Sequence, residues 1–229
     1  MEEVAKKDFF TEEAFKTLRT NIGFCGDDVR VIAITSTFPH EGKSEVALRL
    51  AASFAEMGEK TILLDADNRS SVLRGRIGLT DNPIGLSHLL SGKKKDYKAA
   101  INKTSAKNFD VMFAGPVAPN PTELLSSPRF ANLIETLRND YEYIIIDCPP
   151  LGLVIDAAII AKICDGALLV FAQGQVRKRD AKQMKEQLSM SGVRILGTVL
   201  NKVQPDSKEY GGYGKYGKYG KYGKYGYGE

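Results

Sequence analysis

The sequence predicts an α/β fold: a doubly wound, mostly parallel sheet flanked by helices. Six short runs of nearly continuous apolar residues are typical of parallel strands that are buried on both faces. Helical patterns fall between these runs, and such alternation favours right-handed crossovers within one sheet. The chain has 229 residues, of which 43% are hydrophobic and 26% charged, and this is ordinary for a protein with a buried core.

The predicted elements follow one another along the chain. Strands are predicted where apolar residues run together, over residues 29–36, 61–65, 110–114, 143–147, 167–172 and 195–201. Helices are predicted over residues 44–57, 129–138, 157–163 and 180–191. Another helix, over 12–22, precedes the first strand and carries Phe15, Leu18 and Ile22 on one face. The chain therefore divides into an N-terminal helix (1–28), an α/β domain (29–207) and a tail (208–229).

Composition and charge exclude several classes of protein. No run of about 18 apolar residues is present, so a transmembrane helix is not expected, and the start MEEVAKKDFF does not resemble a secretory signal. Three widely spaced cysteines fit a reducing compartment, which predicts a cytoplasmic protein. Residues 208–229 supply +3 of the formal net charge of +4, so the nearly neutral domain gives no reason to expect nucleic acid as a partner.

The C-terminal segment 208–229 has a composition of its own. It repeats Tyr-Gly-Lys, and glycine at this density, together with mutually repelling lysines, predicts a flexible tail. Phosphorylation would add about −1.5 to −2 charges at each tyrosine, so a few modifications would reverse the sign of the tail. The candidate phosphorylation sites are its seven tyrosines: Tyr210, Tyr213, Tyr216, Tyr219, Tyr222, Tyr225 and Tyr227.

The segment Thr-Phe-Pro-His-Glu-Gly-Lys-Ser, residues 37–44, joins the first predicted strand to a helix. Gly-Lys-Ser between a strand and a helix predicts a P-loop, in which backbone N–H groups cradle phosphates. Lys43 would reach the β- and γ-phosphate oxygens, and the Ser44 hydroxyl would bind magnesium. Thr37 stands where the general P-loop pattern has its first glycine.

Carboxylates follow two other predicted strands. Asp65 and Asp67 end the second strand, and Asp147 ends the fourth, directly after three isoleucines. Ligands of open α/β sheets bind beyond the carboxyl ends of the strands, so both acidic sites should meet the P-loop there. A magnesium ion held by Ser44, aspartate and water would balance the burial of Asp147. The sequence therefore predicts a P-loop NTPase with an acidic site beside its phosphates.

Several segments together resemble the bacterial tyrosine kinases, in particular the separate-chain cytoplasmic kinases of capsule and exopolysaccharide systems. Residues 35–44 are similar to the Walker A motif of that family, 65–69 to its Walker A′ motif and 144–150 to its Walker B motif. Gly-Pro-Val-Ala-Pro-Asn-Pro-Thr-Glu-Leu-Leu (115–125) resembles the stretch between them, and 13–21 resembles the helix through which these kinases form rings. The C-terminal tyrosine cluster completes the match.

The chain departs from the family pattern at four positions. His40 stands in place of a glycine of the phosphate loop, where a Cβ can require another backbone conformation. Glu45 and Cys148 stand where threonine is common, and Lys16 replaces an arginine of the ring helix.

The resemblance implies a set of ligands and functional residues. It implies ATP and Mg²⁺, with nucleotide contacts from Glu41, Gly42, Lys43, Ser44, Glu45 and Asn201, and metal contacts from Ser44, Asp67 and Asp147. It also implies catalytic roles for Lys43, Asp65, Asp67 and Asp147. Asp65 or Asp67 would accept the phenolic proton, and the resemblance favours Asp65. Glu13, Lys16 and Arg19 would form the contacts between subunits.

The resemblance also implies a biological role. The protein would be an ATP-dependent tyrosine autokinase that phosphorylates the tail of a neighbouring subunit and regulates capsular or exopolysaccharide synthesis and export. A transmembrane polysaccharide co-polymerase adaptor would activate it and hold it at the inner face of the membrane. A cognate tyrosine phosphatase and further copies of the chain, in a ring such as an octamer, would be its other partners.

Two other functions fit parts of the sequence. A partitioning or positioning ATPase, a switch without kinase activity, shares the fold, but its signature lysine five residues before the P-loop lysine is Phe38 here. An iron–sulfur ATPase would need ligating cysteines, whereas Cys148 and Cys164 are expected to be small buried hydrophobes.

Overall fold

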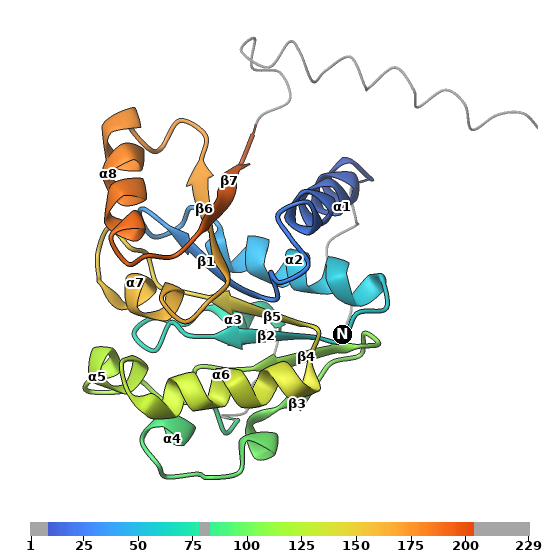
Figure 1. Cartoon of the computed structure of the whole chain (residues 1–229), viewed down its shortest axis with the longest axis vertical. Coiled ribbons are helices and arrows are strands. Elements are labelled where there is room, and N and C mark those ends of the chain that lie inside the picture. Colours follow the sequence, from blue (N-terminus) through green and yellow to red (C-terminus); the bar gives the residue numbers. More distant parts are fainter. Residues whose placement is uncertain (1–8, 78–82, 204–229) are drawn as a thin grey trace, which may run out of the picture.

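The computed structural model describes residues 9–77 and 83–203, and Figure 1 shows its central sheet between helices. In this part of the chain the sheet has seven strands in the order β3-β4-β2-β5-β1-β6-β7. Neighbouring strands are parallel except β3 and β4. The predicted doubly wound, mostly parallel sheet is confirmed. Its strands are β1 (Val31–Ser36), β2 (Thr61–Asp65), β3 (Asn102–Lys103), β4 (Phe109–Met112), β5 (Tyr143–Asp147), β6 (Gly166–Ala172) and β7 (Ile195–Asn201).

The five predicted helices are present, each within three residues of its expected ends. They are α1 (Phe9–Gly23), α2 (Lys43–Glu56), α6 (Pro128–Asp140), α7 (Asp156–Ala161) and α8 (Lys178–Ser189). The sequence did not predict α3 (Leu73–Ile77), α4 (Leu86–Leu90), α5 (Pro121–Leu125), the 3-10 helix η1 (Tyr97–Ala100) or the strand β3. Elements of two to five residues are too short for a hydrophobic period to reveal them.

Alternate residues of the central strands pack against different helices. On β1, Val31 and Ala33 belong to the core shared with α6, α7 and α8, whereas Ile32 and Ile34 belong to the core shared with α1 and α2. The same alternation on β2 and β5 explains why these strands are apolar throughout. Helices therefore cover both faces of the sheet.

Two sequence expectations concern membranes and cysteines. Within residues 9–77 and 83–203, no helix is both long enough and apolar enough to cross a membrane. Cys148 is buried in the apolar core, and Cys164 packs against that core, as expected of small hydrophobes. Burial raises the pKa of both thiols, which disfavours the thiolate form that binds metals.

A charged cluster at the amino-terminal edge of the sheet links β1 to α6. Asp165 accepts hydrogen bonds from the backbone N–H groups of Arg30 and Val31 at 2.9 and 2.7 Å. Arg138 donates to both oxygens of the same carboxylate, at 3.0 and 2.7 Å. Burial works to raise the pKa of Asp165, but Arg138 and the two N–H groups outweigh it and hold this pKa below its ordinary value of 3.8.

The carboxyl ends of the strands collect the predicted site residues at the opposite edge. β1 lies between β5 and β6, where successive connections leave on different faces of the sheet. Asp147 is the register partner of Ile34 on β1 and of Asp65 on β2. The loop after β1 and the acidic residues at the ends of β2 and β5 are therefore neighbours.

Candidate active site

The P-loop (residues 37–42) turns sharply between β1 and α2. Gly42, which caps α2, has a left-handed backbone with φ of 93°, and a Cβ there would lie 2.1 Å from Nδ2 of Asn201. Both conformation and space therefore require glycine at this position. His40 has φ of 65°, so it occupies the left-handed region that glycine would enter without strain.

The end of β7 holds the backbone of the P-loop. Nδ2 of Asn201 donates to the carbonyl oxygen of Glu41 at 2.9 Å, and Nζ of Lys202 donates to that of His40 at 2.6 Å. Asn201, expected to contact the nucleotide, thus shapes the phosphate loop directly. Lys202, which follows Asn201 at the end of the same strand, thus also holds this loop through its side chain.

Glu41 and Glu45, both expected to contact the nucleotide, have protein partners for their carboxylates. Glu41 is 1% exposed, and it accepts the N–H of Phe38 at 2.6 Å and the N–H of Ala172 on β6 at 3.3 Å. Glu45 forms an ion pair with Arg76 on α3 at 3.0 Å. These side chains hold the loop and α3 in place, and contacts to a nucleotide would come from their backbone N–H groups.

Lys43 lies at the centre of the acidic site. Its Nζ is 3.4 Å from Oδ2 of Asp67, 3.4 Å from Oδ1 of Asp147 and 3.3 Å from Oγ of Ser44. Burial alone would lower the pKa of Lys43, but the carboxylates of Asp147, Asp67 and Asp65 outweigh it and raise this pKa. The lysine is therefore a fixed positive charge where three strand ends meet.

Asp65 and Asp147 are buried carboxyls on adjacent strands. Burial raises the pKa of Asp65 to about 7, and the charge of Asp147 acts in the same direction. Burial also raises the pKa of Asp147, against the opposing charge of Lys43. Asp65 accepts hydrogen bonds from the N–H of Asp67 at 3.2 Å and from the hydroxyl of Ser71. One carboxyl of this site can thus hold a proton near neutral pH.

Asp67 shapes the Walker A′ turn that follows β2. Its Oδ1 accepts the N–H of Arg69 at 3.3 Å and the N–H of Ser70 at 3.0 Å, while its Oδ2 faces Lys43. Such side-chain-to-backbone bonds are typical of aspartate in turns. Three strand ends thus bring together the four residues expected to be catalytic: Lys43, Asp65, Asp67 and Asp147.

Residues that the sequence analysis did not single out hold the same turn from outside. Arg69 pairs with Asp156 at the start of α7, and Thr122 on α5 donates to the same carboxylate at 2.7 Å. These residues come from three distant segments, so no local pattern connects them. The signal available was indirect: Arg69 and Thr122 lie in two segments with family resemblance, 65–69 and 115–125.

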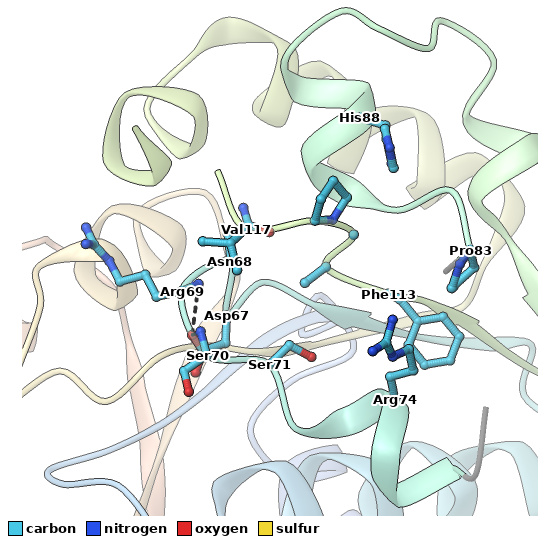
Figure 2. Close-up of a pocket in the computed structure, with 13 residues that line it drawn as sticks. Asp67, Asn68, Arg69, Ser70, Ser71, Arg74, Pro83, His88, Phe113 and Val117 are labelled. Carbon is cyan, nitrogen blue, oxygen red and sulfur yellow. Dashed lines mark hydrogen bonds between the residues drawn. The ribbon is translucent and has the colours of Figure 1, made fainter. Parts of the chain in front are cut away.

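A cavity of about 530 Å³ opens beside Asp67. The Walker A′ turn and Arg74 of α3 line it together with Phe113 and Val117, which follow the end of β4 (Figure 2). His88 of α4 lines a further part of it. The volume is within the range of small-ligand pockets. Asp67 therefore faces Lys43 and also lines a cavity that a second reactant can enter.

The donors present suit a magnesium–nucleotide complex. Protein-bound magnesium usually takes one or two carboxylates, phosphate oxygens and water rather than a cage of protein ligands. Among the described residues no group of three or more His, Cys, Asp or Glu side chains forms a metal site, but Ser44, Asp67 and Asp147 surround Lys43. The cradle at Gly42, which a Cβ would fill, gives the close backbone approach that phosphate needs.

The residues expected to contact other subunits lie on α1. Glu13 and Lys16 form an exposed ion pair at 2.6 Å. Arg19 instead donates to the backbone carbonyl and, at 3.2 Å, to the hydroxyl of Ser53 on α2 of the same chain. Glu13 and Lys16 are thus open to solvent, whereas Arg19 fastens α1 to α2. The seven tail tyrosines expected to be phosphorylated lie outside the described residues.

Known proteins match this chain over most of its length. The family described as "AAA domain" matches residues 29–209. The tyrosine-protein kinase CpsD of Streptococcus pneumoniae serotype 4 is 46% identical over 200 residues, covering 87% of this chain and 88% of that protein. The solved structure of the chimerical protein CapA2B2 matches with a TM-score of 0.82 and 37% identity, covering 87% of this chain and 88% of that one.

A further match is the septum site-determining protein MinD of Pyrococcus horikoshii, solved in complex with Mg-ADP. Its TM-score is 0.64 at 28% identity, and the match covers 75% of this chain and 70% of that one. The chain thus shares the nucleotide-binding fold with a positioning protein but matches CpsD and CapA2B2 over more of its length and at higher identity.

Proposed function

This chain belongs to the AAA-domain family and, within it, to the bacterial tyrosine kinases of capsule synthesis, and we propose that it transfers the γ-phosphoryl group of ATP to the tyrosines of its own tail (208–229). One observation carries the proposal. Lys43 lies 3.4 Å from both Asp67 and Asp147, and Asp67 also lines the adjoining cavity. Asp67 thus belongs both to the part of the site that would bind the nucleotide and to the cavity that would admit the tyrosine.

The nucleotide side works mainly by positioning and charge. In phosphoryl transfer the protein aligns the reactants and neutralises phosphate charge, and covalent assistance is slight. Lys43 would bind the β- and γ-phosphate oxygens, held by a P-loop whose carbonyl groups Asn201 and Lys202 fix. Ser44, Asp67 and Asp147 would hold Mg²⁺, which withdraws negative charge from the phosphates when bound.

The acceptor hydroxyl would approach from the cavity. The phenolic oxygen forms a bond to the γ-phosphorus while the bond from that phosphorus to the bridging oxygen breaks, and ADP leaves with the electron pair. The phenolic proton passes to a carboxylate of the Asp65–Asp67 pair. Asp67 is 5% exposed and lines the cavity, whereas Asp65 is fully buried, does not line the described cavity and accepts the N–H of Asp67. This geometry favours Asp67 as the group that orients the hydroxyl, and the family resemblance favours Asp65 as the final proton acceptor.

The proposed role is regulation of capsular or exopolysaccharide synthesis and export. An activating transmembrane co-polymerase adaptor at the inner face of the membrane and a cognate tyrosine phosphatase are supported by the family to which the chain belongs. Assembly into a ring, with phosphorylation between subunits, is supported by the exposed Glu13–Lys16 pair. A chain carrying both Glu13→Ala and Lys16→Ala, which leaves the contact of Arg19 with Ser53 intact, should sediment as a smaller species, and an unchanged oligomer would refute the assignment of α1 to the ring.

The deciding experiment incubates phosphatase-treated full chain with Mg-ATP and follows it by mass spectrometry of the intact protein and of tail peptides. Successive gains of one phosphate on residues 208–229, absent in Lys43→Met, are expected. The assay is repeated with the adaptor's cytoplasmic segment present. ATP hydrolysis with an unmodified tail in both assays would favour the alternative, a positioning-type ATPase switch, although Phe38 occupies the position of that class's signature lysine.

A further inference from the structure

An unpaired amide lies in the wall of the cavity beside Asp67. Asn68 is 3% exposed, and among the described residues neither its Oδ1 nor its Nδ2 has a hydrogen-bond partner. Asn68 belongs to the Walker A′ turn, and it lines the cavity together with Val117 of the loop after β4 (Figure 2). Buried polar side chains in native proteins are nearly always hydrogen-bonded, so an unpaired donor and acceptor at a cavity wall indicate groups that a ligand supplies.

The chemistry of Asn68 suits an extended peptide. In an extended chain the N–H and C=O of one residue point the same way, and a side-chain amide offers a matching acceptor and donor. These two hydrogen bonds involve only the peptide backbone, so they do not depend on the side chain of the bound residue. They do require the backbone to come close to Asn68. Val117, which also lines the cavity and is 74% exposed, offers an apolar surface against which a phenol ring can pack.

The tail has the feature that this wall requires. Each of its seven tyrosines is followed directly by glycine, whereas the other three tyrosines of the chain, Tyr97, Tyr141 and Tyr143, are followed by lysine, glutamate and isoleucine. Glycine has no Cβ, so its backbone can approach a buried amide closely. Glycine needed only for flexibility would not have to stand on the same side of every tyrosine.

We propose that this cavity is an acceptor site selective for Tyr-Gly, in which Asn68 determines the selectivity by bonding the N–H and C=O of the glycine. The proposal rests on the proposed kinase function. Two consecutive residues would then bind two consecutive residues of the acceptor. Asp67 would bind the hydroxyl of the tyrosine, and Asn68 would bind the backbone of the glycine that follows it. Phosphorylation is thereby restricted to tyrosines that precede glycine.

The test measures kcat/KM for two acceptor peptides, Lys-Tyr-Gly-Lys-Tyr-Gly-Lys and Lys-Tyr-Ala-Lys-Tyr-Ala-Lys, with Mg-ATP. The enzyme is the full chain with its seven tail tyrosines replaced by phenylalanine, so that the tail cannot accept phosphate; each variant carries the same tail, so any binding of the tail to the site affects both peptides alike. We expect kcat/KM to be about tenfold lower for the alanine peptide. In Asn68→Ala both peptides should be equally poor substrates, because the preference itself is lost and not only the rate.

Two further variants separate recognition from damage to the fold. Ser87→Ala is a matched control: Ser87 is 5% exposed, its hydroxyl also lacks a partner among the described residues, and it does not line the cavity. This variant should keep the glycine preference. Asn68→Leu removes the unpaired amide at similar volume, so it should melt no lower than the parent chain and still lose the preference.

Equal kcat/KM for the two peptides on the parent chain, or a glycine preference that survives Asn68→Ala, would overturn the proposal. If neither the tail nor a peptide is phosphorylated, the kinase function is what fails. Fluorescence anisotropy with labelled peptides, the full chain and Mg-ADP then tests the site by itself. Tighter binding of the glycine peptide, lost in Asn68→Ala, supports it, and equal binding of both peptides contradicts it.

Discussion

The guanidinium of Arg69 lies against the carboxylate of Asp156, with Nε 2.7 Å from Oδ2 and Nη2 3.3 Å from Oδ1. The side chain of Asp156 is 1% exposed and that of Arg69 is 41% exposed. Thr122 takes part as well, since its hydroxyl donates to Asp156 and accepts from Arg69 at 2.9 Å. The Walker A′ turn is therefore tied to α5 and α7 by one charged group.

Asp156→Asn should loosen the turn that carries Asp67. We expect the free energy of unfolding to fall by about 1–2 kcal/mol, less than for a fully buried pair, because water can hydrate Arg69 once its partner is neutral. With the turn less well placed, kcat for a tyrosine acceptor should fall about tenfold, and the Kd for Mg-ADP should rise, because Asp67 on this turn would also hold the metal. Urea denaturation, steady-state kinetics and calorimetric titration measure the three effects. Thr122→Val, which replaces the hydroxyl with a methyl group, should lower the free energy of unfolding by about 1 kcal/mol. If Asp156→Asn kept the kinetics of the parent chain, Asp156 would not be needed to position the turn.

His40→Gly should leave nucleotide affinity unchanged and stability nearly so. A left-handed backbone costs a residue with a Cβ about 1–2 kcal/mol, and the greater freedom of glycine in the unfolded chain offsets about 0.5–1 kcal/mol of the relief. Lys202 bonds the carbonyl of residue 40, which glycine retains. Calorimetric titration with Mg-ADP and thermal melting check both expectations. If affinity fell more than tenfold here and equally in His40→Ala, the imidazole itself would contact the nucleotide.

Gly42→Ala should abolish nucleotide binding, since the new Cβ would lie 2.1 Å from Nδ2 of Asn201. The double variant Gly42→Ala, Asn201→Ala removes the clash and keeps two smaller costs: the backbone strain of about 1–2 kcal/mol and the loss of the bond from Asn201 to the carbonyl of Glu41. It should therefore bind Mg-ADP more tightly than Gly42→Ala alone. Fluorescence titration with a labelled nucleotide measures the order. If Gly42→Ala bound nucleotide at the affinity of the parent chain, the clash with Asn201 would be absent and the prediction wrong.

Asp165→Asn should change the acid stability of the fold. The folded-state pKa of Asp165 lies below 3.8, so its charged form stabilises the protein above the pKa of the unfolded state, and this contribution is lost as the pH falls through the folded value. The difference in unfolding free energy between parent and variant should thus be largest near pH 7 and shrink below about pH 4. Urea denaturation at a series of pH values measures it. A difference that is constant over this range would exclude the carboxylate charge as its cause.

Local patterns predicted most of the fold and the charged centre of the site. β1, β2 and β5 are apolar throughout because helices cover both faces, and Lys43, Asp65, Asp67 and Asp147 sit at strand ends that a parallel sheet must align. What the sequence did not reveal depends on contacts between distant segments. The partnership of Arg69 with Asp156 joins α7 to a turn far away in the chain, and no spacing rule relates them.

Side-chain direction was equally beyond the sequence. Glu41 reads as a nucleotide ligand from its place in the loop, yet its carboxylate bonds the N–H groups of Phe38 and Ala172. Asn68 reads as one polar residue of a turn, and only the packed structure leaves its amide buried at the edge of a cavity. Position along a motif predicts which backbone segment is present, whereas the packing of neighbouring segments decides which way a side chain faces.

Because Asn201, Lys202 and the N–H of Ala172 all hold the phosphate loop, that loop is an extension of the last two strands as much as of the first. The P-loop should therefore become disordered when β6 and β7 open, and stay ordered while they are closed. Amide hydrogens of residues 37–42 should exchange with solvent at rates that follow the opening of β6 and β7, and bound nucleotide should slow exchange along those strands. Occupancy of the phosphate site would thus be detectable along β6 and β7, away from the nucleotide itself.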